Sequence, residues 1–166
     1  MTRPPPPLAG FTLLELAIVM AVVAILAAIA VPSYQQLLAR QQLRAAGEAL
    51  ALDLRHAREE ARRSGRPSYV SFGGGPQWCW GISQGQPCDC TSGVPACTQA
   101  RGSARDYPLV ELARADALTF EPSLGRALVA GSATLKSRKG HSLQVQVGAL
   151  GRPLLCGPDA PQPGNC

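Results

Sequence analysis

Residues 10–32 read GFTLLELAIVMAVVAILAAIAVP, and this stretch decides how the rest of the chain is interpreted. Within residues 11–31 only Thr12 and Glu15 are polar. A helix over this range would rise about 32 Å, which is enough to cross the hydrocarbon core of a membrane. The sequence therefore predicts a transmembrane or filament-core helix here.

Glu15 stands out in this apolar segment. An ionised carboxylate inside a bilayer costs about 2.5–3.5 kcal/mol on insertion scales, and such a group usually has a functional partner. Cleavage between Gly10 and Phe11 would create an ammonium group four positions before Glu15. That ammonium could pair with the carboxylate of the same subunit or of a neighbour, which makes Phe11 and Glu15 candidate assembly residues.

Two other interpretations of the segment are a secretory signal cut near Ala28-Ile29-Ala30 and a signal anchor that is never cut. The apolar part of a secretory signal seldom contains an acidic residue, and neither alternative explains why a glycine stands directly before Phe-Thr-Leu-Leu-Glu. Arg3 and the lack of acidic residues before Glu15 favour a cytoplasmic N-terminus with the rest of the chain exported.

After Pro32 the apolar residues recur at intervals of three and four, which predicts an amphipathic second half of the helix over residues 32–64. The residues of this stripe are Ala39, Leu43, Ala46, Leu50, Leu54, Ala57 and Ala61. Gly65 and Pro67 mark the end of the helix near Ser64. Gly47 is predicted to be a soft point within it.

Residues 65–166 are predicted to form a β-rich globular domain with a Cys-rich loop and a C-terminal tail. Short alternating segments between Gly- and Pro-rich turns predict strands at 68–72, 78–83, 108–112, 118–121, 132–137 and 142–147. Trp78, Trp80 and Ile82 alternate on one face, so we expect them in the core. The predicted fold class is α+β, a long N-terminal helix packed on an antiparallel sheet.

All six cysteines follow residue 78, and their even number predicts disulfides in an oxidising compartment outside the cytoplasm. The stretch 81–100 has too little apolar periodicity to fold by packing, so disulfides are its natural constraint. We expect Cys156 to pair with Cys166, and the other four to pair among themselves: Cys79, Cys88, Cys90 and Cys97.

Metal binding and catalysis find no support in the sequence. The cysteine spacing is not that of a zinc finger or ribbon, and the chain has no Cys-x-x-Cys. Its two histidines, His56 and His141, have no nucleophile motif beside them. We therefore predict no metal, no cofactor and no enzymatic activity.

The stretch Gly10-Phe11-Thr12-Leu13-Leu14-Glu15, followed by an apolar helix and Pro32, resembles the class III leader motif of type IV pilins and type II secretion pseudopilins. The resemblance implies a pilin fold, removal of a leader peptide over residues 1–10 by a prepilin peptidase, N-methylation of Phe11, and Glu15 as the family's acidic fifth mature residue. It also implies a single-pass protein of the bacterial inner membrane, with most of the chain periplasmic, that later joins a filament.

Later motifs resemble the FimT/FimU/GspH group of minor pilins and minor pseudopilins: HAREEA over residues 56–61, a Trp-containing strand, LTFEP over residues 118–122, Gly125-Arg126 and Gly151-Arg152. This resemblance implies a minor type IV pilin near the tip or in the initiating complex of a pilus. Its partners would be other major and minor pilins. The alternative is a GspH-like minor pseudopilin of a type II protein secretion system.

A further alternative is a DNA-binding minor pilin for natural transformation. Lys136, Arg138 and Lys139 lie in a predicted turn, and together with Arg152 they could form a phosphate-binding patch. Some FimT-like pilins capture DNA through a C-terminal Gly-Arg-x-Arg element, whereas residues 151–154 here read GRPL. A solvated basic turn is the simpler interpretation.

Overall fold

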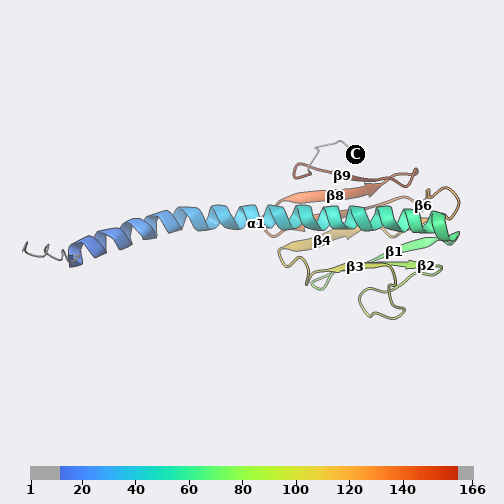
Figure 1. The fold of residues 1–166 in the computed structure, drawn as a ribbon, viewed down its shortest axis with the longest axis horizontal. Coiled ribbons are helices and arrows are strands. Elements are labelled where there is room, and N and C mark those ends of the chain that lie inside the picture. Colours follow the sequence, from blue (N-terminus) through green and yellow to red (C-terminus); the bar gives the residue numbers. More distant parts are fainter. Residues whose placement is uncertain (1–11, 161–166) are drawn as a thin grey trace, which may run out of the picture. The chain divides into compact units, whose positions relative to one another are not determined.

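A computed structural model of the chain describes residues 12–160, which form one α-helix and nine β-strands (Figure 1). The elements are α1 (Leu13–Ser64), β1 (Ser68–Gly73), β2 (Cys79–Gln84), β3 (Ala100–Ser103), β4 (Val110–Ala115), β5 (Leu118–Phe120), β6 (Ala127–Val129), β7 (Gly131–Ser137), β8 (Ser142–Val147) and β9 (Pro153–Cys156). The predicted α+β class is confirmed.

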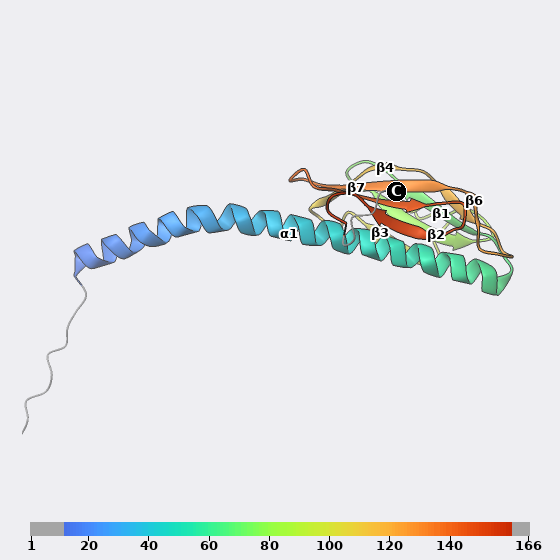
Figure 2. The same ribbon diagram turned by 90° about the horizontal axis from the view of Figure 1, so that it is seen from above.

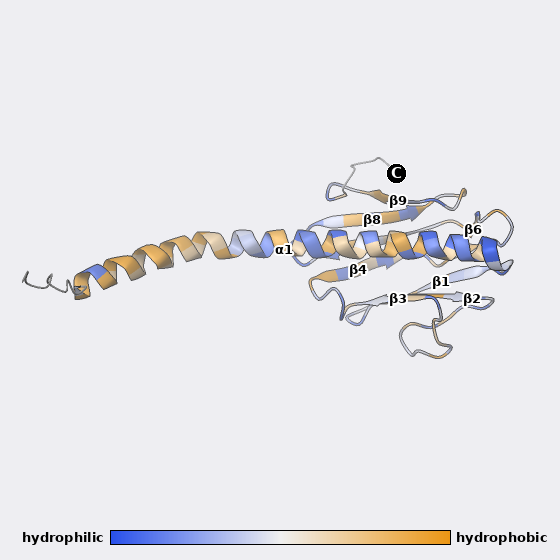
Figure 3. Ribbon diagram, in the orientation of Figure 1, coloured by the Kyte–Doolittle hydropathy of each residue, from blue (hydrophilic) through white to orange (hydrophobic). Residues whose placement is uncertain are grey.

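The chain divides into two compact units within α1, between Leu37 and Leu38. In the first unit every residue from Thr12 to Leu37 is exposed, and Pro32 lies inside the helix without ending it. By length and composition α1 contains a segment able to cross a membrane. Figure 3 shows that this half of the helix is mostly hydrophobic, whereas the other half alternates between hydrophobic and hydrophilic residues.

In the second unit the helix buries the predicted stripe from Ala39 to Ala61. Gly65 ends the helix with a φ of 67°, and its N–H donates to the Ala61 carbonyl at 3.1 Å, as the sequence predicted. That Gly47 is a soft point stays a prediction, and the structure shows a packing reason for a glycine at this position. A Cβ there would overlap Leu143 Cδ2, so the glycine allows a buried leucine to pack against the helix backbone.

The strands form two antiparallel sheets within the described residues (Figures 1 and 2). The five-stranded sheet has the order β3-β2-β1-β5-β6, and the four-stranded sheet has the order β4-β7-β8-β9. Each predicted strand overlaps an observed one, whereas β3, β6 and β9 were not predicted. These three are only three or four residues long, so they show little alternation.

Residues of α1 and of both sheets share one hydrophobic core. Trp78 and Trp80 are both 1% exposed, and their rings stack at a centroid distance of 5.8 Å. The Trp78 Nε1–H donates to the Val110 carbonyl, and the Trp80 Nε1–H donates to Asp53 Oδ2, both at 2.8 Å. The two indoles are therefore core residues with satisfied polar atoms, and neither offers a face for a ligand.

Candidate functional site

Thr12 caps the start of α1. Its Oγ1 accepts the Glu15 N–H at 3.2 Å, and its carbonyl accepts the Leu16 N–H at 3.2 Å. A threonine three residues before a glutamate is the pattern of a capping box, so this role was readable in the sequence but was missed. The predicted cleavage and methylation sites, Gly10 and Phe11, lie outside the described residues.

The Glu15 side chain lies exposed in the first turn of the helix. Among residues 12–160 it forms no ion pair. The Glu15 carboxylate can therefore pair with a cation that lies outside the described residues. The predicted assembly role requires such a pair.

The apolar side chains of the first unit are a candidate assembly surface. Leu13, Ile18, Ile25 and Ile29 are each more than half exposed, and the valines between them, Val19, Val22 and Val23, are 50–54% exposed. Monomeric soluble proteins rarely expose a continuous apolar surface of this extent. An apolar environment, such as lipid or packed helices, would cover such a segment.

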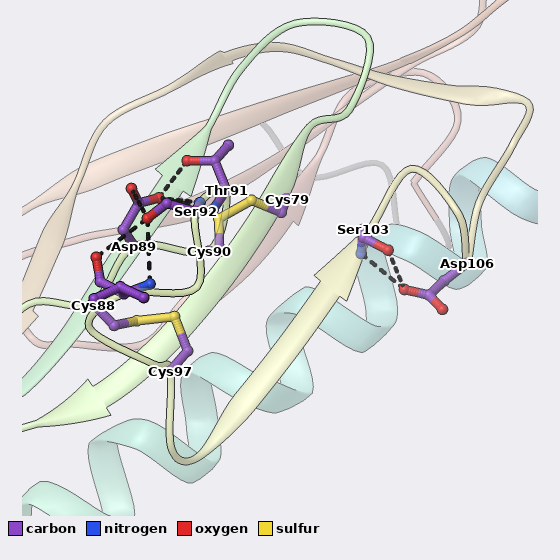
Figure 4. The surroundings of a disulfide bond; sticks show 10 residues. Cys79, Cys88, Asp89, Cys90, Thr91, Ser92, Cys97, Ser103 and Asp106 are labelled. Atoms are coloured by element: carbon purple, nitrogen blue, oxygen red, sulfur yellow. Dashed lines mark hydrogen bonds between the residues drawn. A yellow bond between two sulfur atoms is a disulfide. The ribbon is translucent and has the colours of Figure 1, made fainter.

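Two disulfides hold the Cys-rich loop (Figure 4). Cys79 is bonded to Cys90 and Cys88 to Cys97, with Cα–Cα distances of 5.9 and 5.1 Å. The expected pairing of Cys156 with Cys166 stays a prediction, because Cys166 lies outside the described residues. Among the described residues no group of three or more His, Cys, Asp or Glu side chains is arranged to hold a metal ion.

The Cys-rich loop covers the outer face of β2. Trp80 and Ile82 face the core on one side of this strand, while Gly81 faces the loop on the other. A Cβ at Gly81 would overlap Cys97 Sγ, so only glycine lets the disulfide lie this close to the sheet. Both faces of β2 are buried as a result.

Asp89 organises the tip of this loop. Its carboxylate accepts hydrogen bonds from the Thr91 hydroxyl, from the Ser92 hydroxyl at 2.7 Å and from the Thr91 N–H at 2.8 Å. These bonds, the Thr91 hydroxyl first among them, hold the pKa of Asp89 well below its usual range. Asp89 is therefore ionised near neutral pH, and its hydrogen bonds from Thr91 and Ser92 hold the loop.

The C-terminal segment is fixed to the helix and to β8 through Asp159. The Arg44 Nε–H donates to the Asp159 carbonyl at 3.0 Å, and the Ser142 N–H donates to Asp159 Oδ2 at 3.2 Å. His141 Nδ1 lies 3.5 Å from Asp159 Oδ1, and Arg40 Nε lies 3.9 Å from the same atom. The contacts of Arg40 and Arg44 with Asp159 join residues more than a hundred positions apart, so no local pattern in the sequence signals them.

The four cations of the predicted DNA patch do not come together. Lys136 lies in β7, and Arg138 and Lys139 lie in the β7–β8 turn, where Arg138 Nε is 3.7 Å from Glu111 Oε1. Arg152 lies at the other end of β8, because Lys136 pairs with Ser142 while Val147 pairs with Pro153. The length of β8 separates Arg152 from the other three cations, which lie at the end of β7 and in the β7–β8 turn.

Two family models match the chain. The model described as type II transport protein GspH matches residues 46–151, more than half of the chain. The model of the prokaryotic N-terminal methylation motif matches residues 9–31. No curated protein and no solved structure matches. The first match covers α1 from Ala46 onward and the strands up to β8, and the second covers the apolar segment with the capped Glu15.

Proposed function

Since the chain belongs to the family of type II transport protein GspH and carries the N-terminal methylation motif, it is a type IV pilin-like or pseudopilin subunit, and we propose that it is a minor type IV pilin. Its place is near the tip or in the initiating complex of a pilus. Families of this kind are structural, assemble with other pilin-like subunits and are processed by a prepilin peptidase.

The observation that carries the proposal is the contrast between the two halves of α1. Residues from Thr12 to Leu38 are exposed and mostly apolar, whereas the helix beyond buries one face against the sheets of its own chain. The second unit needs no partner to complete its core, while the first needs an apolar environment. A filament of packed N-terminal helices would provide that environment.

The proposed sequence of events begins in the inner membrane, with residues 11–31 spanning it and the second unit in the periplasm. The prepilin peptidase hydrolyses the Gly10–Phe11 bond, and the new amine of Phe11 is methylated. The exposed Glu15 carboxylate then pairs with the Phe11 ammonium of the same or a neighbouring subunit. This contact neutralises a charge that is costly in an apolar environment and sets the register of the incoming helix.

Intact-mass analysis of the protein from cells tests the processing step. The expected species begins at methylated Phe11, and detection of Met1 on the chain in filaments would overturn the proposal. A variant tests the assembly step: Glu15→Gln should be processed normally but be lost from sheared filaments. Glu111→Gln, at an exposed glutamate in β4, is the matched control and should assemble like the wild type.

The family description favours a second candidate function, that of a minor pseudopilin in a type II protein secretion system. Deletion of the gene separates the two functions. Loss of surface pili with normal export of secreted enzymes supports the pilin, whereas retained pili with secreted enzymes trapped in the periplasm support the pseudopilin. DNA uptake is not proposed, because Arg152 is separated from Lys136, Arg138 and Lys139.

A further inference from the structure

A pocket lies between β3 and the tip of the Cys-rich loop. Its volume is about 440 Å³, which falls within the range of about 300–1,000 Å³ that is usual for small-ligand sites. The Cys79–Cys90 disulfide, Thr91 of the loop, and the end of β3 with the turn that follows it all line this space. Figure 4 shows the disulfide, Thr91, and Ser103 at the end of β3. We call this cavity the loop pocket.

The charges of the loop pocket are positive. Arg101 and Arg105 are the charged residues among those that line it, and both are exposed. Within residues 12–160 neither guanidinium group forms an ion pair or a hydrogen bond. Asp89 and Asp106 are close in sequence but do not line the pocket, and each accepts hydrogen bonds from its own turn. Both arginines can therefore bind an anionic group.

The alternation of β3 directs its polar side chains to the loop pocket. Gly102 lies against the Trp80 ring in the core, since a Cβ at this glycine would overlap the indole. Its neighbours Arg101 and Ser103 therefore face the other side of the sheet, where the Cys-rich loop lies. Ser103 is also the β-sheet partner of Cys79, whose disulfide fixes the loop at this point. The binding groups are thus held in place before a ligand arrives, which lowers the cost of binding.

The neutral polar groups of the loop pocket discriminate between anions. The Thr91 hydroxyl donates to Asp89, and the Ser103 hydroxyl donates to Asp106 Oδ2 at 2.8 Å. Because an ionised carboxylate only accepts, each hydroxyl has used its hydrogen and can offer the pocket only a lone pair. Gln77, exposed at the pocket and without a hydrogen bond among the described residues, can donate or accept. These groups favour a ligand with hydrogen-bond donors beside its anionic group.

We propose that the loop pocket binds an acidic saccharide. A sugar acid carries a carboxylate and several hydroxyl groups on one compact ring. Arg101 and Arg105 would bind the carboxylate, while neighbouring hydroxyls of the sugar would donate to Thr91 and Ser103. The phosphates of a nucleic acid carry no such donors. This recognition role goes beyond the proposed assembly function and does not depend on it.

Calorimetric titration of the full chain in detergent with tetragalacturonate tests the proposal. The matched control ligand is the fully methyl-esterified tetramer, which keeps the ring hydroxyls and lacks the negative charge. We expect the acid to bind at least about tenfold more tightly than the ester, because hydrogen bonds to a charged acceptor are stronger than neutral ones. Equal affinity for the two ligands, or binding of neither, would overturn the inference.

Variants locate the bound sugar. Arg101→Gln with Arg105→Gln should weaken the binding of tetragalacturonate about tenfold or more. Arg66→Gln is the matched control and should leave the affinity unchanged, because Arg66 is also exposed but precedes the opposite end of β1. Gln77→Ala should weaken the binding about threefold through the loss of a neutral hydrogen bond. Near-ultraviolet circular dichroism checks that each variant is folded, and unchanged affinity in the folded double variant would place the sugar elsewhere and defeat the proposal.

Two further ligands test the class of partner. A single-stranded oligodeoxynucleotide and tetraglutamate are titrated at about 0.15 M salt, which screens the overall positive charge of the chain. We expect each to bind about fivefold or more weakly than tetragalacturonate, because neither brings hydroxyl donors beside its anionic groups. Tighter binding of either ligand would overturn the inference. Sheared filaments are analysed separately: absence of the chain there defeats the proposed function only, and loss of sugar binding defeats this inference only.

Discussion

The two halves of α1 have the same secondary structure and opposite surroundings. From Thr12 to Leu38 every residue is exposed, and from Ala39 to Ala61 one face is buried by the strands of the same chain. Leu50 is 0% exposed, whereas Ile25 is 63% exposed. Apolar side chains thus stabilise the fold in one half, while in the other they remain free to contact lipid or other subunits.

The comparison shows that helix formation and burial are separate requirements. An isolated helix is only marginally stable in water, so each half needs a surface to pack against. The second half finds it in the two sheets. The first half has no such surface among the described residues, and the proposed membrane or filament would supply one.

The most direct test of the difference between the two halves of α1 is to truncate one side chain in each half. Leu50→Ala should lower the free energy of unfolding by about 2–5 kcal/mol, because it removes fully buried methyl groups and leaves a cavity. Ile25→Ala should change it by less than about 0.5 kcal/mol. Urea unfolding in detergent, followed by Trp78 and Trp80 fluorescence, measures both. An equal loss in the two variants would contradict the division.

The Cys-rich loop offers the next largest effect. Replacing Cys88 and Cys97 together by serine should cost about 3 kcal/mol, because the unfolded chain regains the freedom that the cross-link removed. The loss should appear in urea unfolding of the second unit and leave membrane extraction of the full chain unchanged. Release of the chain from membranes by this variant would show that the two regions are coupled.

Gly47 and Ala45 allow a buried and an exposed position to be compared within the second half of α1. Gly47→Val should destabilise by about 1–3 kcal/mol, because its side chain would collide with Leu143. Ala45→Val, two residues earlier on the exposed side, should cost only about 0.5 kcal/mol through helix propensity. Thermal unfolding of the two variants, measured in parallel, shows whether the close packing of Leu143 on Gly47 contributes to stability. Equal unfolding temperatures would indicate that it does not.

The C-terminal contact should have the smallest effect. Asp159→Ala removes a carboxylate that accepts the Ser142 N–H and lies near His141 and Arg40, so we expect a loss of about 1–2 kcal/mol. Glu111→Ala breaks the pair with Arg138, in which both side chains are 64% exposed, and should cost less than about 0.5 kcal/mol. The denaturant midpoints of the two variants are compared. Equal midpoints would argue against a role for Asp159 in fixing the C-terminal segment.

The helix was predictable because its signals are local. The stripe from Ala39 to Ala61 repeats with the helical period, and Gly65 with Pro67 stops it. The longer strands were equally readable, since β8 alternates Leu143, Val145 and Val147 with polar residues. Even the cap at Thr12 follows a short pattern that the sequence displays.

What could not be predicted depends on contacts between distant residues. Strand order decides that Arg152 lies far from Lys136, and no local pattern encodes strand order. The division into two sheets has the same origin. Asp159 looks like an ordinary residue of a polar tail until the fold brings His141 and Ser142 beside it.

The cap at Thr12 has an electrical consequence for the processed subunit. Aligned peptide dipoles give the N-terminal end of a helix a partial positive charge, which disfavours a nearby cation by about 0.3–1 kcal/mol. A cut after Gly10 would place an ammonium one residue before that end. Glu15, in the first turn, would then balance the dipole and the ammonium together, so that its removal leaves two positive charges repelling each other at the tip of the helix.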